Sequence, residues 1–107
     1  RQAVVLSDVE GMAYKEIGDL YVKSNKLGVG LSMYAKAADH ATDDEMKRWS
    51  QFLVGRTYLS LDQSDQAQNI FAQIKTAAGP ESFWGQVVDF YTTDILWWNK
   101  YGYLIQK

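Results

Sequence analysis

The chain has 107 residues, enough for one domain whose core removes roughly 60–70% of the unfolded surface from water. Its 47% hydrophobic and 22% charged residues exclude an intrinsically disordered chain, and its net charge of −2 gives no electrostatic basis for binding nucleic acid. The absence of cysteine excludes disulfides, thiolate nucleophiles and thiolate metal sites, and it leaves the redox compartment open.

The beginning of the sequence is unlike the start of a complete protein. It starts at Arg1, without a methionine or a basic-then-apolar leader, so we expect a piece of a longer protein. A signal peptide or anchor upstream of Arg1 would lie outside this sequence, so the localisation stays unknown. No apolar run approaches the ~18 residues that a transmembrane helix needs, and we expect no integral membrane segment within the chain.

Two helices are predicted in the first part of the chain. A capping-box pattern at Ser7–Glu10 predicts that the first helix begins there, with Gln2–Leu6 as a short apolar stub before it. Apolar residues then recur at helical spacing as far as Tyr21. After a polar turn, a second helix is expected from about Gly28 to His40.

Two further helices are predicted in the middle of the chain. Thr42–Glu45 forms another capping box, which predicts a third helix from about residue 43 to residue 61. A polar turn follows, and then a fourth helix from about residue 64 to residue 77. The Gly79-Pro80 pair ends that helix, and Pro80 also suits the first turn of the next one.

The last stretch, Glu81–Ile105, is crowded with aromatic residues. One apolar stripe recurs there at intervals of four and three residues: Trp84, Val88, Tyr91, Ile95 and Trp98. Because no glycine, proline or polar loop interrupts this stripe, we favour one long helix to about Tyr103. The alternative is a break at Thr93, which would make a third, degenerate helix pair. No strand pattern persists anywhere in the sequence, so the predicted fold class is all-α.

Two stretches of the sequence share one spacing of small and aromatic residues, offset by 37 positions. The stretches read Ile17-Gly18-x-x-Tyr21 with Gly30-x-x-x-Tyr34, and Val54-Gly55-x-x-Tyr58 with Ala67-x-x-x-Phe71. A glycine in the middle of a helix costs up to ~1 kcal/mol relative to alanine, so something must offset that cost. We expect the small residues to face each other where the two helices of a pair cross, with the aromatic rings beside them.

This pattern resembles the tetratricopeptide repeat, a helix–turn–helix unit of about 34 residues with the signature L-G-x-x-Y…A-x-x-x-F…P. The resemblance implies an α–α superhelix of antiparallel helix pairs. Repeat one would cover about 11–44, repeat two about 48–81, and the aromatic helix at about 81–105 would cap the end. The sequence departs from the family at the first position of the motif, where Tyr14 and Gln51 replace tryptophan.

The resemblance also implies a binding surface. In such proteins the first helices of successive repeats line a concave groove that receives an extended or helical peptide. The groove-facing positions correspond here to Met12, Lys15, Asp19, Val22, Trp49, Phe52, Arg56 and Leu59. The alternative is that Trp49 and Phe52 pack against the C-terminal helix. In the chaperone-binding branch a lysine–asparagine–arginine set holds a terminal carboxylate; Lys15 matches, but Asp19 replaces the asparagine, so we do not expect that ligand.

A second candidate surface lies on the C-terminal helix, which is apolar on several faces and is therefore expected to be buried on several faces. The preceding helix pair can cover only one of them. We expect either self-association, as a homodimer, or docking to another part of a parent protein. The residues proposed for self-association are Trp84, Val88, Tyr91, Ile95, Trp97 and Trp98. The alternatives are loosely exposed aromatics on a terminal cap and contact with a membrane surface, although the stripe lacks a basic face.

The sequence contains little that could carry chemistry. His40 is the single histidine, and the end of a helix explains it better than a metal cluster with the neighbouring acids Asp39, Asp43 and Asp44. We expect no catalytic residue, no metal and no cofactor. The sequence therefore predicts a non-catalytic scaffold that binds a protein or peptide partner. The alternatives are a homo-oligomerisation module and a regulatory segment of a larger multidomain enzyme.

Overall fold

The structure, a computed structural model, describes the backbone of residues 2–101 and the side chains of residues 13–97, 100 and 101. All secondary structure in this part of the chain is helical, so the fold is all-α as predicted. The helices are α1 (Gln2–Lys23), α2 (Leu27–His40), α3 (Asp44–Ser60), α4 (Ser64–Ala78) and α5 (Phe83–Tyr101).

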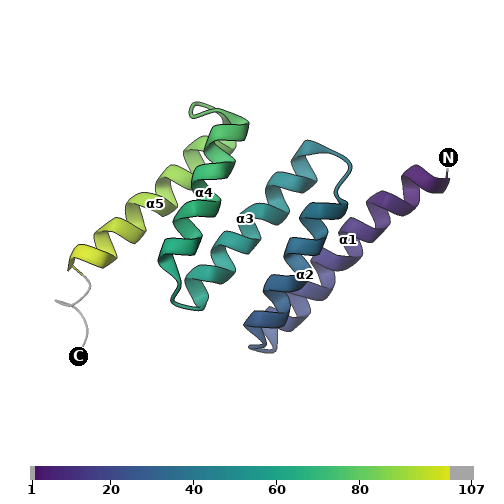
Figure 1. Cartoon of the computed structure of the whole chain (residues 1–107), viewed down its shortest axis with the longest axis horizontal. Helices are drawn as coiled ribbons and strands as arrows, with labels where there is room; N and C mark the ends of the chain where they lie inside the picture. Colours follow the sequence, from purple (N-terminus) through teal and green to yellow (C-terminus); the bar gives the residue numbers. More distant parts are fainter. Residues whose placement is uncertain (1, 102–107) are drawn as a thin grey trace.

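The helices are arranged as a row in which each one packs against the next. Consecutive helices make the main contacts, and α1 also touches α3, the first helix of the following pair. The Cα atoms extend over 55 × 34 × 15 Å, so the row is long and thin. Figure 1 shows α1 and α5 at opposite ends of the row, with the N-terminus far from the end of α5.

The turns after α1 and α3 have the same unusual backbone. Asn25 and Asp62 adopt left-handed φ angles of 64° and 63°, a conformation that asparagine and aspartate tolerate better than other residues with a side chain. Each turn is then closed by an amide–carbonyl hydrogen bond, from Lys26 to Tyr21 at 2.8 Å and from Gln63 to Tyr58 at 2.9 Å. The two turns are therefore equivalent at the offset of 37 residues.

One predicted helix start and one predicted helix cap are wrong. α1 begins at Gln2 and not at Ser7, because the residues before Ser7 include no glycine or proline that would stop a helix from extending through them. The cap of α3 is Asp43 and not Thr42: Asp43 has extended backbone angles, and its side chain accepts a 2.7 Å hydrogen bond from the Met46 amide.

The C-terminal stretch forms one helix, α5, with no break at Thr93. This confirms the preferred interpretation of the sequence, since the apolar stripe runs across Thr93 without interruption. The predicted end of the helix, at about Tyr103, lies outside the described residues.

The core lies between α3, α4 and α5. Its buried side chains are Phe52, Ala67, Phe71, Ile74, Trp84, Val88 and Ile95. Because burying one large apolar side chain contributes about 1.5–3 kcal/mol, this cluster is the main source of stability in the second half of the row.

The first helix pair is held by a close backbone crossing, as predicted. A Cβ atom added to Gly18 would lie 3.3 Å from the carbonyl oxygen of Gly30, and one added to Gly30 would lie 3.2 Å from that of Gly18. In both pairs the nearest neighbour is an aromatic ring of the second helix: an added Cβ would lie 2.7 Å from the ring of Tyr34 at Gly18 and 2.5 Å from that of Phe71 at Gly55. Glycine is therefore needed in both pairs because a neighbour occupies the space of a side chain.

Candidate protein-binding groove

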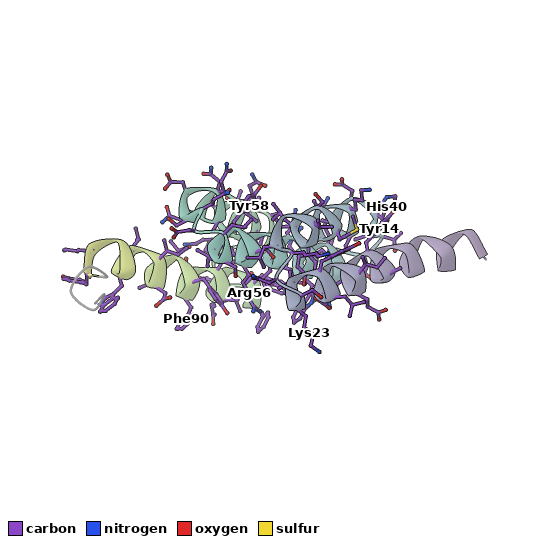
Figure 2. All side chains as sticks on the ribbon, turned by 90° about the horizontal axis from the view of Figure 1, so that it is seen from below. Tyr14, Lys23, His40, Arg56, Tyr58 and Phe90 are labelled. Carbon is purple, nitrogen blue, oxygen red and sulfur yellow. The ribbon has the colours of Figure 1, made fainter. Side chains whose placement is uncertain are left out.

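The predicted groove residues lie on α1 and α3, the first helices of the two pairs. Figure 2 shows Arg56 and Lys23 pointing toward one broad side of the molecule, and Tyr58 and His40 toward the other. The side chain of Met12 lies outside the described residues. The remaining predicted positions divide into exposed and packed side chains.

Lys15, Asp19 and Tyr34 form a polar cluster that joins α1 to α2. The Lys15 Nζ atom lies 3.4 Å from Oδ2 of Asp19, one helical turn away. The Tyr34 hydroxyl donates a hydrogen bond to Oδ1 of Asp19. Burial raises the pKa of the Tyr34 hydroxyl, as does the Asp19 carboxylate, and the charge of Arg56 acts in the opposite direction. The Asp19 carboxylate is therefore already engaged by its own chain.

Arg56 lies near this cluster and is exposed. It lines a narrow crevice of about 40 Å³ between α1, α2 and α3, together with Val22, Tyr34, Leu53, Thr57 and Ser60. Among the described residues it forms no salt bridge. Its guanidinium group is thus available to an acidic group from outside the chain.

Trp49 lies toward the N-terminal end of α3 and is 43% exposed. One edge of its ring system packs against Trp84 at a centroid distance of 5.7 Å, and Lys15 Nζ lies 5.8 Å from the ring centroid. The ring borders an open hollow of about 350 Å³, lined by Lys15, Asp43, Glu45, Met46 and Trp49. Trp49 therefore both packs against the C-terminal helix and presents an aromatic surface to solvent.

Phe52, Leu59 and Val22 serve mainly as packing residues. The Phe52 ring is only 7% exposed and contacts the rings of Phe71, Trp84 and Tyr91 at centroid distances of 5.2–5.9 Å. Phe52 thus packs against the C-terminal helix, which was the alternative to a role in the groove. It presents little surface to a partner. Leu59 is half-buried against the same core, and Val22 packs on Gly30.

The residues predicted for self-association are mostly covered within the chain. Trp84, Val88 and Ile95 are buried in the core, and Tyr91 is half-buried against it. Of the set, Trp97 is exposed, and the side chain of Trp98 lies outside the described residues. Trp84, Val88, Tyr91 and Ile95 of the stripe therefore face α3 and α4.

The exposed apolar residues of α5 form a different set, of which only Trp97 belongs to the predicted residues. They are Phe83, Phe90, Leu96, Trp97 and Tyr101. The signal that could have identified them is the interval of seven residues from Phe83 to Phe90 and from Phe90 to Trp97.

The described residues bring together no group of three or more histidine, aspartate or glutamate side chains that could hold a metal ion. None of the described helices combines the length and apolar character needed to cross a membrane. His40 ends α2, where its ring stacks on that of Tyr14 at a centroid distance of 5.1 Å.

Comparisons with protein-family models, with curated proteins and with solved structures find no match to this chain.

Proposed function

We propose that this chain is a tetratricopeptide-like scaffold that binds a protein or peptide partner and carries out no catalysis. The repeated geometry of the two helix pairs supports this proposal. α1 ends at Lys23 and α3 ends at Ser60, while their partner helices begin at Leu27 and Ser64, so both boundaries recur after 37 residues. Repetition of whole helix pairs is the defining feature of helical-repeat scaffolds.

The turns support the same architecture at atomic detail. Asn25 and Asp62 have nearly identical left-handed φ angles, and the hydrogen bonds that close the two turns join equivalent residues. In this proposal α5 is the first helix of a third unit, which caps the row and covers the core of the second unit. This resembles the capping elements that terminate helical-repeat arrays.

The observation that carries the binding proposal is the exposure of Arg56 and Trp49 on one helix of the predicted groove. Seven positions separate the two residues, so they lie on the same side of α3 and about 10 Å apart along its axis. Aromatic and arginine side chains are the residues most enriched at binding hot spots. We infer a peptide partner with an acidic side chain opposite Arg56 and an apolar side chain against Trp49.

A peptide-display selection on the immobilised chain tests this proposal. We expect enrichment of peptides that combine an acidic and an apolar residue. Arg56→Glu should weaken their binding at least ~10-fold, since a charge-assisted contact of about 1.5–3 kcal/mol would be lost and a repulsive one introduced. Isothermal titration of the selected peptides measures this change.

Lys47→Glu is the matched control, because it makes the same charge change on the same helix. Nine positions from Arg56, it points to the opposite side of α3. Equal losses for Arg56→Glu and Lys47→Glu would show only a general effect of net charge and would contradict the groove.

A further inference from the structure

α5 carries an apolar face that the described part of the chain leaves uncovered. Phe83 is 67% exposed, Phe90 is 70% exposed and Trp97 is 43% exposed, and the three follow one another at intervals of seven residues. Seven residues fall only ~20° short of two full helical turns, so the three side chains form a nearly straight line along the helix. In Figure 1 α5 stands at one end of the row, and its C-terminal half projects past α4.

Two hollows lie along this line, one after the other. Their volumes are about 390 Å³ and about 410 Å³. The first includes Phe83, Gln86, Val87 and Phe90, and the second includes Phe90, Thr93, Asp94 and Trp97. Both sets have the spacing i, i+3, i+4 and i+7, which is the spacing of the four residues that receive one side chain of a facing helix in knobs-into-holes packing.

We propose that this face of α5 binds the same face of a second copy of the chain, with the two helices antiparallel. The face supplies both the knobs and the holes of this packing, because the side chains of Phe90 and Trp97 protrude and also line the hollows. An antiparallel partner would insert Phe90 into the second hollow and Trp97 into the first. The two-fold symmetry of the pair makes the reciprocal contacts identical, as an isologous interface requires.

The charges at the two ends of α5 favour the antiparallel orientation. Glu81 lies two residues before the first residue of the helix, and Lys100 lies in its last turn. An antiparallel pair places Lys100 near Glu81 of the other copy at both ends. It also aligns the two helix dipoles in opposite directions, which is their favourable arrangement. A parallel pair would instead place Lys100 beside Lys100. In the antiparallel pair Asp94 lies near Asp89 of the other copy, but Asp89 is already paired with Lys75 of α4 at 2.7 Å.

The size of the face determines the expected affinity. Aromatic side chains present about 150–250 Å² each, so the exposed fractions of Phe83, Phe90 and Trp97 correspond to roughly 270–450 Å² of apolar surface per copy. Two copies would bury roughly 540–900 Å², which is the size of a weak, transient interface. We therefore expect a reversible dimer with a dissociation constant of roughly 1–100 µM.

A lipid surface fits this face less well than a second copy. Between Phe83 and Tyr101 the helix has one cation, Lys100, against two acids, Asp89 and Asp94. Interfacial helices carry lysine and arginine along their polar face, where they meet anionic lipid.

Sedimentation velocity over a range of concentrations from about 5 to about 500 µM tests the proposal, since this range spans the expected dissociation constant. We expect a monomer–dimer equilibrium for the chain as it stands. Phe90→Glu should leave only monomer, because it places a charge in the centre of the interface. Phe83→Lys, at one end of the face, should weaken the dimer at least ~10-fold.

Leu20→Glu is the matched control, because Leu20 is an equally exposed apolar residue, at 64%, on α1. This variant should dimerise like the unchanged chain, and circular dichroism verifies that all variants remain helical. A monomer throughout the concentration range would overturn the proposal, as would a dimer that survives both α5 substitutions.

The orientation can be tested with disulfides, because the chain contains no cysteine of its own. Thr93 lies near the middle of the proposed interface, so Thr93→Cys should form a disulfide-linked dimer. Lys100→Cys alone should not, but it should cross-link to Glu81→Cys when the two variants are mixed. Cross-linking of Lys100→Cys to itself, without cross-linking to Glu81→Cys, would overturn the antiparallel arrangement.

This interface goes beyond the proposed groove, and the two can fail separately. Arg56→Glu should leave the dimer unchanged, whereas Phe90→Glu should leave the binding of selected peptides by the monomer unchanged.

Discussion

At the scale of single residues, the glycines explain why the helix pairs are close. Gly18 and Gly30 stand where two backbones approach closely, and the space that a side chain would need is occupied by Tyr34 at Gly18 and by Val22 at Gly30. The position of this crossing could be predicted from the sequence, because a glycine inside a helix is costly and its recurrence 37 residues later at Gly55 indicates a structural reason. The nearest neighbour of this glycine is the equivalent aromatic ring in both pairs, Tyr34 for Gly18 and Phe71 for Gly55, as the spacing predicted.

Gly18→Ala tests this explanation. Alanine favours the helix by up to ~1 kcal/mol, but its Cβ would lie 2.7 Å from the buried ring of Tyr34, which has no room to move away. Overpacking of this kind costs about 1–3 kcal/mol, so we expect a net decrease in the free energy of unfolding. Urea denaturation measures it.

Gly28→Ala supplies the control for Gly18→Ala. Gly28 also lies in a helix, but nothing lies within 4 Å of an added Cβ. This substitution should leave the free energy of unfolding unchanged or raise it by up to ~1 kcal/mol. Stabilisation by both substitutions would show that the crossing tolerates a side chain.

At the scale of helices, sequence patterns predicted the number of elements and most of their ends. Where they failed, a local signal was outweighed by its surroundings. The capping box at Ser7 does not begin α1, because the residues before it also favour a helix. On α5 the sequence contains two apolar lines, and which of them is buried depends on how α4 approaches. Trp84, Val88 and Ile95 of one line are buried, and the line through Phe90 is exposed.

The docking of α5 depends on the tight turn that precedes it. An added Cβ on Gly85 would lie 2.6 Å from the carbonyl oxygen of Pro80 and would also meet the carbonyl oxygen of Gly79. These are backbone atoms, so the whole turn would have to move. We expect Gly85→Ala to lower the free energy of unfolding by about 1–3 kcal/mol.

Lys75→Met gives the comparison for Gly85→Ala on the same pair of helices. It removes the salt bridge between Lys75 and Asp89, whose side chains are 41% and 50% exposed. An exposed ion pair contributes no more than about 1 kcal/mol, so Lys75→Met should lower the free energy of unfolding by less than Gly85→Ala does. Chemical denaturation of both variants decides the order, and a larger loss for Lys75→Met would contradict the importance of the turn.

At the scale of the whole molecule, stability is distributed unevenly along the row. Most contacts join neighbouring helices; α1 also touches α3, and Trp49 and Phe52 of α3 contact rings of α5. The apolar core lies between α3, α4 and α5. The all-α class and the stacking order follow from helical spacing and short turns, which are local features. The distribution of burial depends on contacts between helices. Trp49 and Phe52 both occupy groove-facing positions of the motif, so the sequence could not predict that Trp49 is exposed and Phe52 is buried.

This uneven distribution predicts a gradient of hydrogen exchange. α4 contributes Ala67, Phe71 and Ile74, all at 0% exposure, and it is covered by α3 and α5. α1 has 22 residues against 14 in α2, and Figure 1 shows its N-terminal end extending past its partner. In a row of units that contact only their neighbours, such an unsupported end opens without the rest.

Hydrogen exchange measured by mass spectrometry should therefore be slowest for amides in the middle of α4 and fastest for amides in the first turns of α1. Because each 1.4 kcal/mol of opening free energy changes the exchange rate about tenfold, the two segments should differ in exchange rate by at least ~100-fold. Equal protection of the amides of α1 and α4 would mean that the row unfolds as a single unit.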